Sequence, residues 1–149
     1  MTAYLDTSAL MKLLILEAGS AELSIALAGA ATEKMLASSQ ISYVEAGAAI
    51  ARRERESTVS MAACAMARHQ LEDDRPAYAI VDVTPTLVRL AAEYADAFAL
   101  RGFDAVQLAS AQTVERTVPG PWRFMAFDIR LSRGAKLLGL ELPPWAPLQ

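Results

Sequence analysis

The stretch that most constrains the fold is Met1–Lys12, where a short apolar run ends at a carboxylate. Ala3–Leu5 is long enough only for a buried strand, and Asp6 closes it. Ser8 precedes the apolar-periodic residues of a helix, so we expect it to be the helix N-cap. Asp6 is therefore predicted to lie where a central strand ends and a helix begins, which is where open α/β sheets bind ligands.

The remaining chain alternates short apolar runs with helical patterns. Further strands are expected at 34–37, 79–83, 123–127 and 139–142. Further helices are expected from Ser20 to residues 29–32, at 40–56, from Ser57 to about 72–76, at 85–98, from Asp104, and from Asp128 to about Leu138. This alternation predicts one α/β domain over residues 1–142, with a central parallel sheet of short strands covered on both faces. A Pro-rich tail, 143–149, follows.

Composition restricts the function classes. The net charge of −3 weakly opposes a purely electrostatic nucleic-acid binder, but not an enzyme that neutralises phosphate with bound cations. No apolar run approaches the roughly 20 residues of a membrane span, and Asp6 interrupts any N-terminal signal core, so we expect a cytoplasmic protein without membrane association. The 54% hydrophobic content suggests an oligomer or a protein partner, and the single Cys64 excludes an internal disulfide.

Four acidic residues are candidates for a site. Asp6 and Asp128 follow strands, Asp104 opens a helix, and Glu45 shares a helix side with apolar neighbours. Each has an ordinary structural alternative: a turn or a helix cap for the aspartates, and a partly exposed position between two packed faces for Glu45. Their common arrangement is more informative than any one of them.

Four carboxylates facing one cleft would repel one another and lose hydration. A hard divalent cation resolves both problems, and oxygen-only ligands without a nearby His or Cys favour Mg²⁺ or Mn²⁺. Such an ion can activate water and stabilise charge on a phosphoryl group, so a phosphodiester is the expected substrate.

Four segments in the same order resemble the PIN domain family, and more narrowly its VapC toxins of type II toxin–antitoxin pairs. They are Tyr4–Leu10, Ser42–Glu45, Arg101–Ala109 and Phe127–Leu131, with Gly139-Leu140 downstream. The resemblance implies a PIN-like three-layer α/β/α fold and a metal-dependent endoribonuclease, usually a homodimer, inhibited by a cognate antitoxin. It implies that Asp6, Glu45, Asp104 and Asp128 form the acidic cluster, with Thr7 or Ser8 supporting the metal.

One position departs from the pattern. Many relatives carry Thr or Ser two residues before the last acid, where this chain has Ala126. This removes a hydroxyl near Asp128 and leaves open an alternative, a PIN-fold module that binds RNA or protein with weak or no cleavage. An aspartyl-phosphate phosphatase would require a second acid where Ser8 stands, and a dinucleotide-binding module lacks its Gly-rich turn here.

The remaining charged and aromatic candidates have plainer interpretations. Lys12, Arg130, Arg133, Lys136 and the charged stretch 52–56 are expected to be solvated surface, with steering of RNA phosphates as the alternative. An antitoxin contact is a further alternative for 52–56. His69, the only histidine, lies on a polar helix end and is given no catalytic role. Tyr43, Tyr94, Phe98 and Phe103 are assigned to the core or an interface rather than to base stacking.

Overall fold

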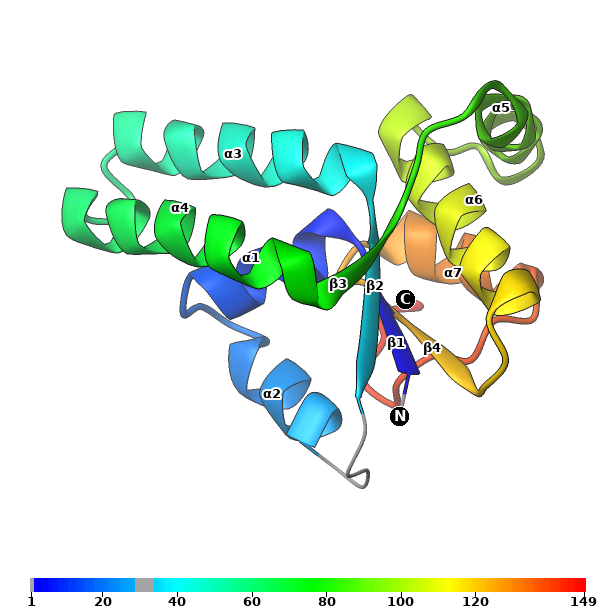
Figure 1. The fold of residues 1–149 in the computed structure, drawn as a ribbon, viewed down its shortest axis with the longest axis horizontal. Coiled ribbons are helices and arrows are strands. Elements are labelled where there is room, and N and C mark those ends of the chain that lie inside the picture. The colour runs from blue at the N-terminus through cyan, green and yellow to red at the C-terminus, as the bar shows by residue number, and fades with distance from the viewer. Residues whose placement is uncertain (1, 29–33) are drawn as a thin grey trace.

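A four-stranded parallel sheet forms the centre of the computed structural model, which describes residues 2–28 and 34–149 (Figure 1). The strands are β1 (Thr2–Leu5), β2 (Met35–Ser39), β3 (Tyr78–Val81) and β4 (Trp122–Met125), in the order β3-β2-β1-β4. β1 is a continuous buried apolar run, as expected of a strand covered on both faces. The chain leaves β1 toward β2 and later returns to the other side of β1 as β4, so the order reverses beside β1.

Helices cover both faces of this sheet, which confirms the expected three-layer α/β/α architecture (Figure 1). One side carries α1 (Thr7–Leu14), α2 (Ser20–Ala28), α3 (Gln40–Arg55) and α4 (Met61–Asp74). The other carries α5 (Pro85–Phe98), α6 (Gly102–Thr117) and α7 (Ile129–Leu137). A short 3-10 turn, Arg75–Ala77, leads into β3. None of the helices in the described residues has the length and hydropathy of a membrane span.

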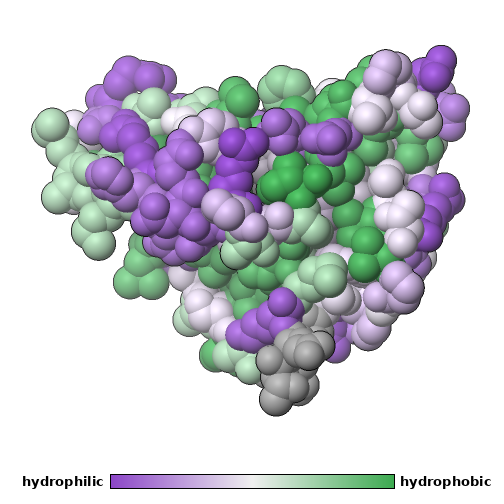
Figure 2. All heavy atoms as spheres, viewed as in Figure 1, coloured by the Kyte–Doolittle hydropathy of each residue, from purple (hydrophilic) through white to green (hydrophobic). Residues whose placement is uncertain are grey.

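Two hydrophobic clusters lie on opposite sides of the sheet, and a third joins α1 and α2 to β1. The largest packs α5, α6 and α7 against β1 and β4, with Leu108 and Leu131 fully buried. The second lies between α1, α3 and α4 and contains Cys64, a buried free thiol that fills space among apolar neighbours. In Figure 2, hydrophilic side chains gather over α4 and the end of α3, whereas hydrophobic ones cover the centre of this face.

Three expectations about element ends are corrected. Residues 139–142 form only an isolated bridge of Glu141 with Arg123, because Pro143 and Pro144 that follow have no N–H to extend a ladder. The helix expected from Ser57 begins at Met61, because Ser57 has a φ of 55° and Ser60 supplies the cap. The helix expected from Asp104 starts two residues earlier, and the expected helix end in 29–32 lies outside the described residues.

The turn between α1 and α2 depends on a glycine. Gly19 has a φ of +93°, and a Cβ there would lie 2.6 Å from Phe127 Cε1 and 3.0 Å from Lys12 Cδ. Both the backbone conformation and the close packing therefore favour glycine at this position.

We expect Gly19→Ala to lower the free energy of unfolding by about 1–3 kcal/mol, since it combines strain at a positive φ with a steric overlap. Gly47→Ala is the matched control. Gly47 lies within α3 with no atom within 4 Å of its would-be Cβ, so alanine should stabilise by about 0.5–1 kcal/mol. Urea unfolding of the two variants should shift the midpoint in opposite directions; equal shifts would contradict the role of the Gly19 turn.

Candidate active site

All four acidic candidates line one pocket of about 510 Å³ at the carboxyl ends of β1 and β4. Asp6 follows β1, Glu45 lies in the second turn of α3, Asp104 in the first turn of α6, and Asp128 immediately precedes α7. This edge is the point where the strand order reverses, the usual ligand site of open α/β sheets.

Asp6 is the most buried of these carboxylates, with 4% of its surface exposed. It is the N-cap of α1, since its Oδ1 accepts a hydrogen bond of 2.8 Å from the Ala9 N–H. The expectation that Ser8 caps this helix is therefore wrong. Ser8 Oγ instead donates to the Asp6 carboxylate at 2.7 Å and accepts a 2.8 Å bond from the Phe127 N–H. Ser8 thus ties Asp6 to the loop that carries Asp128.

Burial raises the pKa of Asp6 from its ordinary 3.8 to about 7. The hydrogen bonds from Ser8 and Ala9 oppose this rise, and the negative charge of Glu45 adds to it. The groups that lower the pKa of this carboxylate are hydrogen-bond donors, Ser8 and Ala9, rather than cations.

Gln107 of α6 connects the elements around Glu45. Its Nε2 lies within hydrogen-bond distance of Thr7 Oγ1 (3.0 Å), Ser42 Oγ (2.9 Å) and Glu45 Oε2 (2.9 Å), and its Oε1 accepts from Tyr4 Oη at 2.7 Å. Thr7 Oγ1 donates to the same Glu45 oxygen at 2.5 Å. The Glu45 side chain is therefore held by hydrogen bonds from α1 and α6 as well as by its own helix.

Asp104 and Asp128 are more accessible. Partial burial raises the pKa of Asp104, with further increases from the charges of Asp128 and Glu45 and a decrease from Arg101 and Arg130. Asp128 is exposed and caps α7, its Oδ1 accepting a 2.9 Å bond from the Leu131 N–H. The alternative that it serves as a helix cap is thus realised, although it also lines the pocket.

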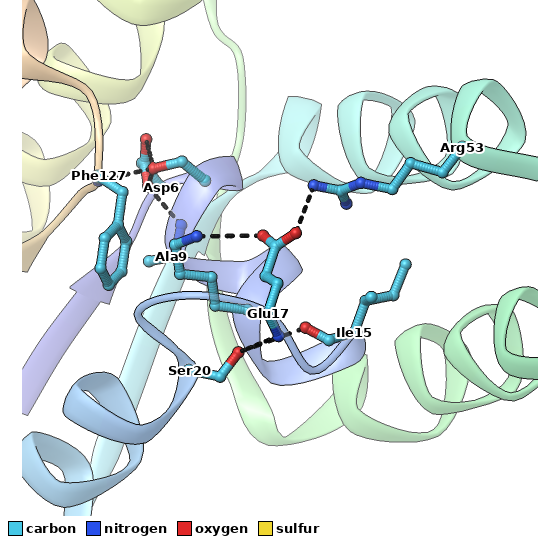
Figure 3. A network of polar contacts seen from close by, with 9 residues as sticks. Asp6, Ala9, Ile15, Glu17, Ser20, Arg53 and Phe127 are labelled. Atoms are coloured by element: carbon cyan, nitrogen blue, oxygen red, sulfur yellow. Dashed lines mark hydrogen bonds and ion pairs between the residues drawn. The ribbon is translucent and has the colours of Figure 1, made fainter. Parts of the chain in front are cut away.

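A set of ion pairs forms another wall of the pocket (Figure 3). Glu17 accepts from Lys12 Nζ at 3.1 Å and from Arg53 Nη2 at 2.9 Å. The Lys12 ammonium also lies 4.6 Å from the centre of the Phe127 ring, with only 14% of the side chain exposed. Lys12 is therefore not the solvated surface residue that was expected. Its partner Glu17 holds it in place beside the acids.

The donor set contains oxygen atoms only, from the four carboxylates and the hydroxyl groups of Thr7 and Ser8. Within residues 2–28 and 34–149, no three His, Cys, Asp or Glu side chains are grouped closely enough to bind one metal ion. This arrangement fits a Mg²⁺-like ion, which typically keeps several waters and binds one or two carboxylates directly. It does not fit a fully protein-coordinated ion.

Arg101, Gln107 and Glu17 line this site and were given no role in it by the sequence reasoning. Gln107 could have been recognised as an isolated polar residue among Ala105, Val106, Leu108 and Ala109. Glu17 had no comparable signal, because it lies in a turn and its partners come from two different helices.

The raised pKa of Asp6 predicts a pH-dependent stability in the metal-free protein. Between pH 4 and 7 the folded protein keeps a proton that the unfolded chain has released, so its free energy of unfolding falls as the pH rises. From pH 5 to 8, urea unfolding in EDTA should show wild type losing roughly 2–3 kcal/mol relative to Asp6→Asn. Parallel pH profiles for the two proteins would contradict a raised pKa at Asp6.

We expect Gln107→Leu to destabilise the protein by about 2–4 kcal/mol, because it leaves the buried Tyr4 hydroxyl and Ser42 without this partner. Gln112→Leu is the matched control on the same helix. Gln112 is similarly buried, and its Oε1 has no hydrogen-bond partner among the described residues, so the change should cost less than about 1 kcal/mol. Thermal unfolding compares the two; similar losses would show that the network around Gln107 contributes little.

Comparisons with known proteins agree with this fold. The family model described as the PIN domain matches residues 3–137. Two curated proteins of Mycobacterium tuberculosis strains, "Ribonuclease VapC45" and "Ribonuclease VapC49", are each 36% identical to this chain over 143 residues. Each match covers 95% of this chain and 94% of the relative.

Solved structures share the fold at lower sequence identity. VapBC-1 from nontypeable Haemophilus influenzae matches with a TM-score of 0.62 at 11% identity, over 97% of this chain and 98% of that one. VapBC2 from Rickettsia felis, bound to a DNA fragment from its promoter, gives 0.61 at 12% identity, over 97% and 99%. The family model spans most of the sequence and the curated relatives match almost from end to end, so the chain belongs to the PIN domain family.

Proposed function

We propose that this protein is a metal-dependent endoribonuclease of the VapC type, acting as the toxin of a toxin–antitoxin pair. The observation that carries the proposal is the pocket that carboxylates from four separate elements line at the reversal point of the sheet. The names of the two curated relatives, both ribonucleases, support RNA as the substrate.

The acidic residues would hold a divalent cation, Mg²⁺ or Mn²⁺. Asp6, Glu45 and Asp104 would bind it directly or through water, and Asp128 would complete the cluster. The raised pKa values of Asp6 and Asp104 support this assignment, since each is raised partly by neighbouring carboxylates that a cation would compensate. When bound, such an ion activates water for attack on phosphorus and stabilises charge on the phosphoryl group.

The protein's own contribution is to keep these carboxylates in place before the substrate arrives. Ser8 and the start of α1 hold Asp6, and Thr7 with Gln107 holds one oxygen of Glu45. Ala126 is buried in the main core cluster and offers no hydroxyl to Asp128. The Ser8 hydroxyl accepts a hydrogen bond from the Phe127 N–H in the loop that carries Asp128. We assign Thr7 and Ser8 to support of the acidic cluster.

The partner we propose is a cognate antitoxin in the cytoplasm. Large apolar side chains are exposed at Leu16, Ile25, Met61 and Met66, along the α1–α4 side of the molecule. Both solved structures named above as sharing the fold carry the name VapBC, which supports such a partner here. The same apolar surface could complete a homodimer. A monomer without affinity for any antitoxin would contradict this assignment.

The proposal predicts discrete RNA cleavage that requires both the metal and the acids. Purified protein with Mg²⁺ or Mn²⁺ should cut total cellular RNA into defined products, and EDTA should abolish them. Asp6→Asn and Asp104→Asn should each lower the rate by about 100-fold or more, since even loss of a residue supporting a metal ligand costs 10–100-fold. Metal should also raise the melting temperature of wild type more than that of Asp6→Asn.

Asp96→Asn is the control, because Asp96 is exposed on α5 and lies outside the pocket. It should cleave RNA like wild type. Activity that survives both EDTA and the two pocket variants would rule out the metal–carboxylate mechanism. A folded, metal-binding protein that binds RNA without cutting it would favour the alternative, a binding module, which the absence of a hydroxyl at Ala126 also favours.

A further inference from the structure

A second hollow, which we call the α3 groove, lies beside the acidic pocket. It has a volume of about 620 Å³ and runs along α3, with Val44, Ala48 and Ala49 in its lining and Phe103 of α6 across from them. Val44 and Ala48 are one helical turn apart, and Arg55 lies on the same side nearer the end of α3. The small alanine side chains leave the space that the groove occupies.

The α3 groove adjoins the acidic pocket. Glu45, Ala49 and Arg52 line both hollows. A chain whose reacting bond lies among the acids can therefore extend along α3 without leaving the protein surface.

The exposed groups of the groove are of two kinds. Phe103 is 61% exposed and makes no aromatic pair with a described residue, so of the two places expected for it, the core or an interface, the core is excluded. Val44 beside it is 68% exposed. Arg52 and Arg55 are also exposed, and neither forms an ion pair within the part of the chain that the structure describes.

An open aromatic face next to unpaired arginines is the combination with which proteins hold single-stranded nucleic acid. Bases stack on the aromatic ring whatever their sequence, and arginines bind the phosphates between them. The positive charge of these arginines distinguishes the α3 groove from the exposed apolar residues that we assign above to a protein partner. The groove thus complements a polyanion with flat apolar groups better than it complements a purely apolar surface.

We propose that the α3 groove binds the nucleotides flanking the scissile phosphate of single-stranded RNA, with a base stacked on Phe103 and a phosphate on Arg55. This inference rests on the proposed function, because it takes RNA as the substrate of the adjacent pocket. It assigns a binding role to two residues that take no part in the chemistry.

The test is the binding of fluorescently labelled oligouridylate, measured by anisotropy in EDTA so that cleavage cannot interfere. Phe103→Ala should weaken binding by about tenfold, the loss of one base stack, and Phe103→Trp should restore it. Arg55→Ala should weaken binding and reduce the slope of log affinity against log salt by about 0.7, the value for one phosphate of a single strand. Leu137→Ala and Arg89→Ala, at exposed positions on α7 and α5, should change neither quantity.

Wild-type affinity in both Phe103→Ala and Arg55→Ala would overturn the proposal. So would a Phe103→Ala variant that alters the mass of the protein in sedimentation but leaves RNA affinity unchanged, since the groove would then be a protein interface. A cleavage assay of the same variants on cellular RNA distinguishes failure of this inference from failure of the proposed function. Groove variants that cut and bind normally refute the groove alone, whereas groove-dependent binding without any cleavage refutes the nuclease and keeps the groove.

Discussion

The rest of the site depends on one buried carboxylate. Asp6 ends β1 and caps α1 at the same time, so the sheet edge and the first helix both fix its position. Its burial is unfavourable for the charged form, as the raised pKa indicates, and two hydrogen bonds compensate only in part. A divalent cation bound beside Asp6, as proposed above, would offset this cost.

The charges of Lys12 and Arg53 do not offset the unfavourable burial of Asp6. Lys12 and Arg53 line the same pocket as Asp6, yet both are engaged by Glu17. An ammonium free to approach Asp6 would lower its pKa, whereas the pKa is raised. The Glu17 ion pairs therefore hold these two positive charges on one wall of the pocket, whereas Arg52 and Arg101 line the pocket without an ion pair among the described residues.

The sequence allowed the layers and the position of the acids to be predicted, because short buried strands and the helix over 85–98 follow local periodicity. It did not predict correctly which residue caps α1, because Asp6 and Ser8 are both good caps, and their roles are separated by the bond of Asp6 with the Ala9 N–H and that of Ser8 with the Phe127 N–H. The sequence also did not indicate that Phe103 is exposed, since this depends on how α6 lies relative to α3. Contacts between distant elements, such as those of Gln107 and Glu17, leave little local pattern.

One helix, α3, supplies residues to both the acidic pocket and the α3 groove. In α3, Ser42, Ala46 and Ile50 face inward and are buried, which fixes the helix against the sheet and α4. The 3.6-residue period then sets Glu45, Ala49 and Arg52 along the acidic pocket, and Val44, Ala48 and Arg55 along the groove. Because these positions belong to one helix, helix geometry fixes how far apart the backbone positions of Glu45, Arg52 and Arg55 lie. The residues proposed for metal binding and those proposed for RNA binding thereby share one helix.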